Sequence, residues 1–387
     1  MAQRPRLLIL TPDFPPAPGG IQLMSHRLAT GIDGFETMTV TLDSPGASRF
    51  DGDGSLAVRR VGASGAPRAA SNILLNAVAF REALRYRPAV TLSIHTVVSP
   101  AALAVRRVLG APAVQYFHAN EIGARPKLAA FAAARADVVI AVSAYTAGLI
   151  TATGAVPASM RLISPGVDIP SDASPEKVDR PTILTIARLE QDYKGHDVML
   201  RALPSVRANV PDVQWVVLGD GPLRAGLERQ VHANGISDAV RFLGAASDQV
   251  RNLWLRRAHL LAMPSRLPEG GLAGEGFGIV FLEAGAYGKP VVAGNVAGAL
   301  DSVSDGETGL LVDPRDPRAV AEAITRLLLD PELAARLGAA GAARAQDFAW
   351  PVIAERVEQV LLEQQARSSP PRVSGVRRRE RSGRMST

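Results

Sequence analysis

Residues 182–219, "TILTIARLEQDYKGHDVMLRALPSVRANVPDVQWVVLG", contain two runs of apolar and β-branched residues separated by a segment long enough for one helix. The runs at 182–188 and 213–219 are apolar on both faces, which is typical of strands covered by helices on both sides. A strand, a helix and a second strand in this order predict two parallel strands of one sheet.

The same alternation extends over most of the chain. Short apolar runs separated by helix-length segments recur in both halves and predict one parallel sheet in each. In the first half these runs are 6–11, 37–42, 89–95, 112–118, 137–143 and 161–166. In the second half they are 182–188, 213–219, 240–244, 259–265 and 290–294.

The polar, proline-containing stretch 166–181 separates the two sets of runs and is the best linker in the sequence. We therefore expect two doubly wound α/β domains with ligands bound beyond the carboxyl ends of the strands, in a cleft between the domains. A helix-like segment after the second domain is expected to pack back across the domains. The expected units are an N-terminal domain at 1–170, a C-terminal domain at 180–348, a helix at 349–366 and a tail at 367–387.

Composition limits the class of protein. The chain has 387 residues, of which 47% are hydrophobic and 21% charged, enough for more than one core. It has no cysteine, which excludes disulfides and thiolate metal sites. The apolar run near the N-terminus is too short for a signal peptide, and no stretch reaches 18 apolar residues. We therefore expect a soluble, cytoplasmic protein.

The net charge of +6 is concentrated at the C-terminal end. Residues 367–387 contain seven Arg and one Glu, which accounts for the whole net charge and leaves residues 1–366 neutral. The neutral body gives no reason to expect a nucleic-acid partner. The Pro, Ser and Gly content of the tail favours a disordered, solvated segment, and peripheral contact with an anionic membrane at its inner face is the alternative.

Two carboxylates in "EGGLAGEGFGIVFLEAGAYGKPVVAG" (269–294) need an explanation, because an ionised carboxylate among apolar residues is costly unless it has a partner. If a helix begins near Gly276, Glu275 lies at its N-terminus and Glu283 about 12 Å further along it. Gly276 and Gly278 leave the amides at the helix start open to an anion. A ligand with hydroxyls at both ends and phosphate in the middle, such as a nucleotide sugar, fits this pattern.

Other strand ends supply the remaining candidates. Arg188 closes an apolar run and Lys194 lies in the following loop, so both are expected to point into the cleft where a diphosphate would lie. Gly19 and Gly20 follow the first strand and open a helix with accessible N–H groups. His118 closes a buried strand, with Glu121 just beyond it. A structural role and a site role both stay open for this histidine.

These residues carry a family resemblance over nearly the whole chain. The sequence resembles the retaining GT-B glycosyltransferases of family 4, and is most similar to phosphatidylinositol mannosyltransferases that use GDP-mannose. The resemblance implies a GT-B fold, in which two Rossmann-like domains face a cleft, with the acceptor on the N-terminal side and the nucleotide sugar on the C-terminal domain. The segments that carry it are "TPDFPPAPGGIQ" (11–22), "YFHANEIG" (116–123), "ISPGVD" (163–168), "ARLEQDYKG" (187–195), "VVLGDGP" (216–222), "VRFLG" (240–244) and "EGFGIVFLE" (275–283).

The resemblance also implies a role for each candidate. The catalytic group consists of residues near the transferred sugar and the diphosphate: His118 and Glu275 at the sugar, and Arg188 and Lys194 at the leaving group. The donor-binding group consists of residues with main-chain, ribose, phosphate or base contacts: Gly19, Gly20, Asp248, Gly276, Phe277, Gly278, Ile279 and Glu283. Asp248 is the weakest member of this set, assigned to the base.

The expected reaction is transfer of a hexose, with mannose as the first choice, from a nucleoside diphosphate sugar to a hydroxyl of a lipid, glycan or small molecule. The anomeric configuration is retained, and no metal or other cofactor is expected. "DGD" at 51–53 matches a D-x-D metal motif, but its Gly- and Ser-rich setting favours a turn. The acceptor, the sugar and the nucleotide stay open.

The sequence argues against other classes of protein. An incomplete dinucleotide fingerprint at 218–226 and the absence of G-x-S-x-G argue against a dehydrogenase and a hydrolase. A GT-B fold sugar-nucleotide epimerase is disfavoured by the two glutamates spaced eight residues apart. A non-catalytic nucleotide-sugar-binding regulator is disfavoured by the full set of charged candidates.

Overall fold

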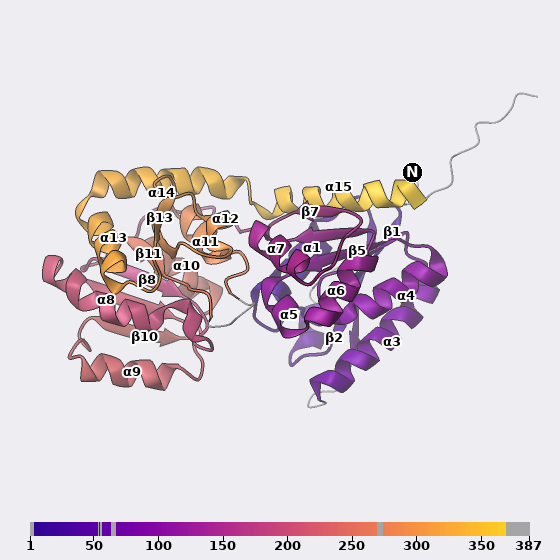
Figure 1. Cartoon of the computed structure of the whole chain (residues 1–387), viewed down its shortest axis with the longest axis horizontal. Helices are drawn as coiled ribbons and strands as arrows, with labels where there is room; N and C mark the ends of the chain where they lie inside the picture. The colour runs from indigo at the N-terminus through magenta and orange to yellow at the C-terminus, as the bar shows by residue number, and fades with distance from the viewer. Residues whose placement is uncertain (1–3, 53, 55, 63–66, 269–273, 369–387) are drawn as a thin grey trace, which may run out of the picture.

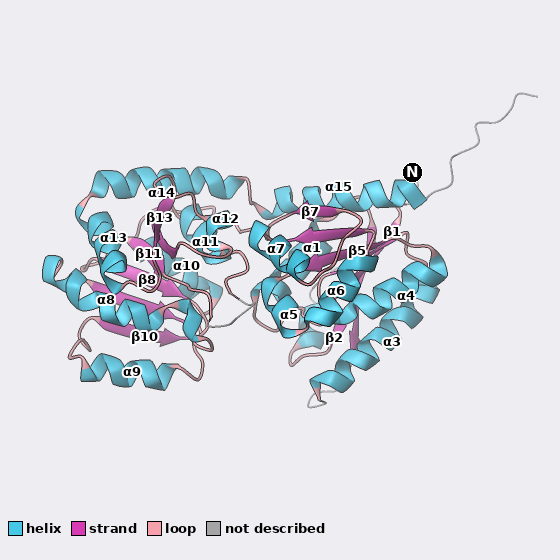
Figure 2. Ribbon diagram, in the orientation of Figure 1, coloured by secondary structure: helices cyan, strands magenta, loops and turns pink. Residues whose placement is uncertain are grey.

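The computed structural model describes residues 4–52, 54, 56–62, 67–268 and 274–368. In this part of the chain the protein forms two parallel β-sheets, one in each half of the sequence, with helices packed around them (Figure 1). The secondary-structure view separates the two sheets clearly (Figure 2). The α/β architecture with two doubly wound sheets, predicted from the alternating apolar runs, is confirmed.

The first sheet has seven strands in the order β3-β2-β1-β4-β5-β6-β7, and each neighbouring pair is parallel. The strand order reverses between β1 and β4, and doubly wound sheets bind ligands at such a switch point. The middle strands are buried on both faces, as their continuous apolar runs predict. The strands are β1 (Arg6–Leu10), β2 (Glu36–Leu42), β3 (Ala57–Val61), β4 (Val90–Ser93), β5 (Ala113–Phe117), β6 (Val138–Ala141) and β7 (Met160–Leu162).

The second sheet has six strands in the order β10-β9-β8-β11-β12-β13, again all parallel. Its order reverses between β8 and β11, so the loops after these two strands define its ligand-binding edge. The strands are β8 (Thr182–Ile186), β9 (Gln214–Leu218), β10 (Val240–Gly244), β11 (Leu260–Met263), β12 (Val291–Gly294) and β13 (Gly309–Val312).

Helices connect the strands of both sheets, and some starts are set by local sequence. Asp316 caps α13 by accepting a hydrogen bond from Arg318 N at 2.8 Å, and Pro317 occupies the first turn. The helices of the first half are α1 (Gly20–Gly31), α2 (Ala47–Gly52), α3 (Arg68–Tyr86), η1 (Thr96–Val98), α4 (Ser99–Leu109), α5 (Ala119–Ala124), α6 (Pro126–Arg135) and α7 (Ala144–Ala152). Those of the second half are η2 (Asp192–Lys194), α8 (His196–Asn209), α9 (Arg224–Ala233), α10 (Asp248–Arg257), α11 (Ile279–Ala286), α12 (Ala299–Ser302), α13 (Pro317–Leu329) and α14 (Pro331–Gln346).

The last helix, α15 (Trp350–Ser368), returns to the first domain and lies along α1 and β4 (Figure 1). Trp350 and Val357 are part of the first domain's apolar core. The two crossings between domains pair with each other, because Val167 N donates to Phe348 O and Trp350 N donates to Val167 O. The sequence predicted that a final helix would pack back, and the structure shows that it completes the first core.

Candidate active site

Lys194 and Glu275 form an ion pair at the switch point of the second sheet. Lys194 ends η2 after β8, Glu275 lies in the loop after β11, and Nζ is 2.5 Å from Oε2. The two side chains are only 17% and 15% exposed. Burial alone would lower the pKa of Lys194, but the adjacent Glu275 carboxylate outweighs it and the pKa is raised. The ammonium is therefore a stable cation, and it is the partner that Glu275 needs.

Arg188 lies near this pair but does not join it. Its side chain is 72% exposed and its Nη1 is 3.2 Å from Glu190 Oε2. Its charge lowers the pKa of Lys194 slightly, which places the two cations within electrostatic reach. An exposed ion pair contributes little stability, so Arg188 can leave Glu190 for another anion at low cost.

The helix after Glu275 starts later than the sequence prediction placed it. That prediction was wrong by three residues: α11 begins at Ile279, and Gly278 is its N-cap with φ of +84°. A Cβ at Gly278 would lie 2.6 Å from the Phe281 ring, so this turn requires glycine. Glu275 therefore stands in the loop before the helix, whereas Glu283 lies within the helix.

The residues of this turn hold the two domains together. Gly276 O accepts a hydrogen bond from Ser143 Oγ at 2.6 Å, and Asp301 Oδ1 accepts one from Ala144 N at 2.8 Å. Phe277 is buried against Phe348, and Ile279 packs against apolar residues of the first domain. Main-chain contacts of this turn with a donor stay a prediction, which concerns Gly276, Phe277, Gly278 and Ile279.

Glu283 is paired with Arg251, which the sequence analysis did not single out. Arg251 Nη1 lies 3.4 Å from Glu283 Oε1. Burial raises the pKa of Glu283, and the charges of Asp168 and Asp248 add to the effect while Arg251 opposes it. The carboxyl group is therefore a buried acceptor held in place by one cation. Asp248 itself is 86% exposed at the start of α10, and its assignment to the base stays a prediction.

In the first domain, the glycine pair opens α1 as predicted. The helix begins at Gly20, and Gly19 has φ of +149° with its Cβ position 2.1 Å from Gln22 Oε1. L side chains rarely adopt this φ, so the backbone at this position favours glycine. Whether these glycines contact phosphate or acceptor stays a prediction.

His118 follows β5 and caps α5. Its Nε2 lies 3.2 Å from Ile94 O and its ring stacks on Tyr116 at 5.8 Å. Burial lowers the pKa of His118. Two neighbours that the sequence analysis did not place in the site adjoin it: Glu121, which is 4% exposed, and His95, which follows the neighbouring strand β4. The signal that could have found His95 is its position after an adjacent buried strand.

In the D-x-D match, Asp51 has a structural role as the partner of Arg60. Asp51 lies on α2, and its carboxylate accepts hydrogen bonds from Arg60 at 2.8 and 3.0 Å. Asp53 lies outside the described residues. Within the described ranges, no group of three or more His, Asp or Glu side chains is arranged to hold a metal ion. The same part of the chain contains no helix long and apolar enough to cross a membrane.

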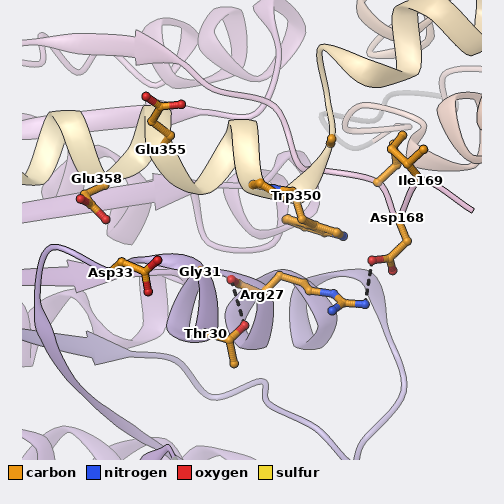
Figure 3. A pocket seen from close by; sticks show the side chains of 12 residues that line it. Arg27, Thr30, Gly31, Asp33, Asp168, Ile169, Trp350, Glu355 and Glu358 are labelled. Carbon is orange, nitrogen blue, oxygen red and sulfur yellow. Dashed lines mark hydrogen bonds and ion pairs between the residues drawn. The ribbon is translucent and has the colours of Figure 1, made fainter. Parts of the chain in front are cut away.

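A cavity of about 770 Å³ lies where the chain crosses between the domains. Its walls come from α1, from the segment around Asp168 and from the start of α15 (Figure 3). Arg27 on α1 reaches across to Asp168, with Nη2 2.7 Å from Oδ1. None of the predicted site residues lines this cavity. The cavity is therefore not the site around Lys194 and Glu275, despite its size.

Comparison with known proteins identifies the family. The model for glycosyltransferase family 4 matches residues 18–170, and the model for glycosyl transferases group 1 matches residues 169–344. A GDP-mannose-dependent alpha-(1-6)-phosphatidylinositol monomannoside mannosyltransferase of Mycobacterium tuberculosis is 34% identical over 361 residues, covering 87% of this chain and 92% of the relative. The chain belongs to glycosyltransferase family 4. The resemblance stated from the sequence motifs is confirmed, and the protein is a glycosyltransferase.

A second relative and two solved structures support the same family and fold. A mannosyltransferase with the same description from Mycolicibacterium smegmatis is 32% identical over 382 residues, covering 92% of this chain and 98% of its own. Among solved structures, Anabaena HepE in complex with UDP aligns with a TM-score of 0.77 at 21% identity, over 92% of this glycosyltransferase and 100% of that chain. Sucrose-phosphate synthase from Thermosynechococcus elongatus aligns at 0.78 and 22%, over 94% and 100%. These structures confirm the GT-B fold.

Proposed function

We propose that this glycosyltransferase transfers mannose from GDP-mannose to a hydroxyl of a phosphatidylinositol-type lipid, with retention of anomeric configuration. The donor and acceptor rest on the descriptions of the two relatives, which match over most of their length. Retention rests on the family. The proposal needs no metal ion, because Lys194, which Glu275 holds in place, and the exposed Arg188 can supply positive charge to the diphosphate.

The Lys194–Glu275 pair is the observation that carries the proposal. As the bond to the diphosphate breaks, negative charge grows on the leaving group and positive charge on the sugar. A buried cation beside a buried carboxylate matches this separation of charge, and preorganised groups of this kind stabilise a transition state strongly. Lys194, helped by Arg188, meets the leaving group, and Glu275 meets the hydroxyls of the sugar.

The step at the anomeric carbon is proposed as a short-lived ion pair that the acceptor attacks on the face the leaving group departs from. Glu275 is held by Lys194 and Glu283 by Arg251, so neither is a free nucleophile. A lipid acceptor lies at a membrane surface, and the basic tail is proposed to contact anionic lipid there. Most of that tail, residues 369–387, lies outside the described residues.

Incubation of the full chain with GDP-mannose and vesicles containing phosphatidylinositol tests the proposal. A mannosylated lipid whose anomeric proton retains the donor's α configuration supports it. In parallel, thermal shift with GDP-, UDP- and ADP-sugars should favour the GDP-sugar, since a ligand at 100 times its Kd adds about 2.7 kcal/mol of stability. A larger shift with a UDP-sugar would overturn the GDP-mannose assignment while leaving the family intact.

A further inference from the structure

An ion pair between the first domain and the crossing lines the cavity described above. Arg27 on α1 and Asp168 in the crossing face each other across it, and Figure 3 shows the guanidinium of Arg27 extending toward the carboxylate of Asp168. Arg27 Nη2 lies 2.7 Å from Asp168 Oδ1. The two side chains are 39% and 47% exposed, so solvent reaches the pair and the contact contributes little to stability.

Asp168 is also a neighbour of α11, the helix that carries Glu283. Val167, directly before Asp168, packs in one apolar cluster with Leu282, which directly precedes Glu283. Ile169, directly after Asp168, packs against the same cluster. Burial is the largest cause of the raised pKa of Glu283, and the charge of Asp168 adds to it. The packing and the charge effect both place Asp168 beside the glutamate assigned to the ribose.

Other charged or titratable groups lie around Glu283. Arg251 on α10, with Nη1 3.4 Å from Glu283 Oε1, opposes the rise of the pKa, and Asp248 on the same helix adds to it. On α11 itself, burial raises the pKa of Tyr287, so its hydroxyl is neutral. Of the elements that also pack on α11, β11 and β12 carry no charged residue, while Arg336 and Arg344 of α14 and Asp301 of α12 bind main-chain groups.

The counter-ion of Asp168 decides how strongly Asp168 repels a negative charge on Glu283. An ion pair acts on a third charge more weakly than a single ion does, because the two opposite fields partly cancel. With Arg27 in place, the repulsion is therefore reduced. The ionised carboxylate of Glu283 has two oxygens that only accept hydrogen bonds, which suits the two hydroxyl donors of a ribose.

We propose that Arg27 is a positioning residue for the nucleotide, which neutralises Asp168 beside Glu283 and thereby keeps Glu283 in the ionised form that binds the ribose. This inference rests on the proposed function. Arg27 belongs to the first domain and Glu283 to the second, so the effect requires the domains to be held together. By linkage, a bound nucleotide in turn favours the contact of Arg27 with Asp168.

Two single variants that break the same ion pair should act in opposite directions. Arg27→Met leaves Asp168 without its counter-ion, so the pH midpoint of GDP binding should move up by about half a unit or more, which is about a threefold loss of affinity below the midpoint. Asp168→Asn removes the negative charge, so the midpoint should move down by a similar amount. Calorimetry with GDP across this pH range measures both, and the phosphate of GDP titrates alike in every variant.

The double variant, Arg27→Met with Asp168→Asn, should have a midpoint close to that of the wild-type chain, because neither charge is left. Arg6→Met and Glu36→Gln are the matched controls. Their ion pair is 39% and 50% exposed and lies at the amino ends of β1 and β2, opposite the ligand-binding edge, so the midpoint should stay in place. A purely structural role of the Arg27–Asp168 pair would weaken GDP binding in both single variants and would overturn the inference.

Titration of Glu283 without nucleotide separates this inference from the proposed function. Carboxyl-carbon NMR can follow Glu283, whose signal is the one missing in Glu283→Gln. Its midpoint should rise in Arg27→Met and fall in Asp168→Asn. Midpoints that move in the same direction in both variants, or in neither, would contradict a role of Arg27 in the charge of Glu283. If the wild-type chain binds no GDP, the proposed function fails, and the NMR titration still decides that role.

Discussion

Lys194 Nζ lies 2.5 Å from Glu275 Oε2, so that two side chains predicted from separate motifs are each other's counter-ion. Their positions after β8 and β11 follow from the reversal of strand order in the second sheet. Under the proposed function, a diphosphate that reaches Lys194 would compete with Glu275 for the ammonium group. We therefore expect the diphosphate and the sugar of the donor to be coupled through this ion pair.

Glu275→Ala should separate turnover from nucleotide affinity. The variant loses contacts to a sugar that becomes cationic, so kcat should fall, while GDP affinity should stay equal or increase because Lys194 loses its competitor. Removing Glu275 also removes a charge-assisted hydrogen bond, which should lower the free energy of unfolding by about 1.5–3 kcal/mol. The melting temperature of the protein should fall accordingly. Added GDP should restore part of that loss. Loss of GDP binding in this variant would contradict the arrangement.

Glu283→Ala should show the opposite pattern. The ribose does not change during the reaction, so the loss of about 1.5–3 kcal/mol should appear as weaker binding of GDP and of GDP-mannose alike. Calorimetry with GDP measures this directly. Glu176→Ala, at a surface carboxylate paired with Arg256 and Arg257, is a control of the same chemistry outside the site. Equal losses of GDP affinity in Glu275→Ala and Glu283→Ala would show that the two glutamates do not lie at opposite ends of one ligand.

If Glu283 binds the ribose, its raised pKa should give donor binding a pH dependence. The folded protein holds this proton more tightly than the unfolded chain, so the contribution of Glu283 to stability is present below its ordinary pKa and is lost as the pH rises through the raised value. Ribose hydroxyls donate to the ionised form, so GDP affinity should fall as the pH drops through that value. The phosphate of GDP also titrates, and Glu283→Gln, which lacks the carboxyl, corrects for it. Parallel pH curves for the two proteins would refute the ribose assignment.

The sequence predicted the sheets and the charged candidates because both depend on local patterns. Continuous apolar runs are required wherever a strand is buried on both faces, and β4 and β5 show them. Lys194 is a candidate because it lies in the loop after an apolar run, and Glu275 because it is a carboxylate beside an apolar segment that contains glycines. The pairing between them, across 81 positions, depends on the fold of the loops and has no local signal.

The start of α11 and the position of His95 beside the site could not be predicted from the sequence, for physical reasons. The start of α11 was placed too early because Gly276 and Gly278 both suit a helix start, and only the collision with Phe281 selects Gly278. His95 ends the apolar run 89–95, and that pattern predicts only a buried strand. Its ion pair is with Glu121, which comes from α5, four elements later along the chain, and which the pairing of β4 with β5 brings beside it.

The basic tail should act at the membrane and not in catalysis. Deleting residues 369–387 leaves α15 complete, so hydrolysis or transfer of the donor in solution should be unchanged. Binding to vesicles that contain anionic lipid should weaken with the deletion and, in the full chain, with added salt, since exposed charges are screened within about 8 Å at physiological ionic strength. Sedimentation with anionic and neutral vesicles measures both effects. Equal vesicle binding by the full chain and the deletion variant would show that the tail does not contact the membrane.

Trp350→Ala should destabilise the first domain, although the residue lies more than 180 positions after the last strand of that sheet. Trp350 is 5% exposed and packs in the same core as β1 and β4, so truncation should cost about 3–5 kcal/mol. Leu362→Ala is the control on the same helix, because Leu362 is 38% exposed and its loss should change stability by about 0.5 kcal/mol or less. Thermal unfolding with and without GDP separates the domains, since GDP should raise only the transition of the second. If Trp350→Ala lowers the GDP-sensitive transition and spares the other, α15 belongs to the second domain and its assignment to the first core is wrong.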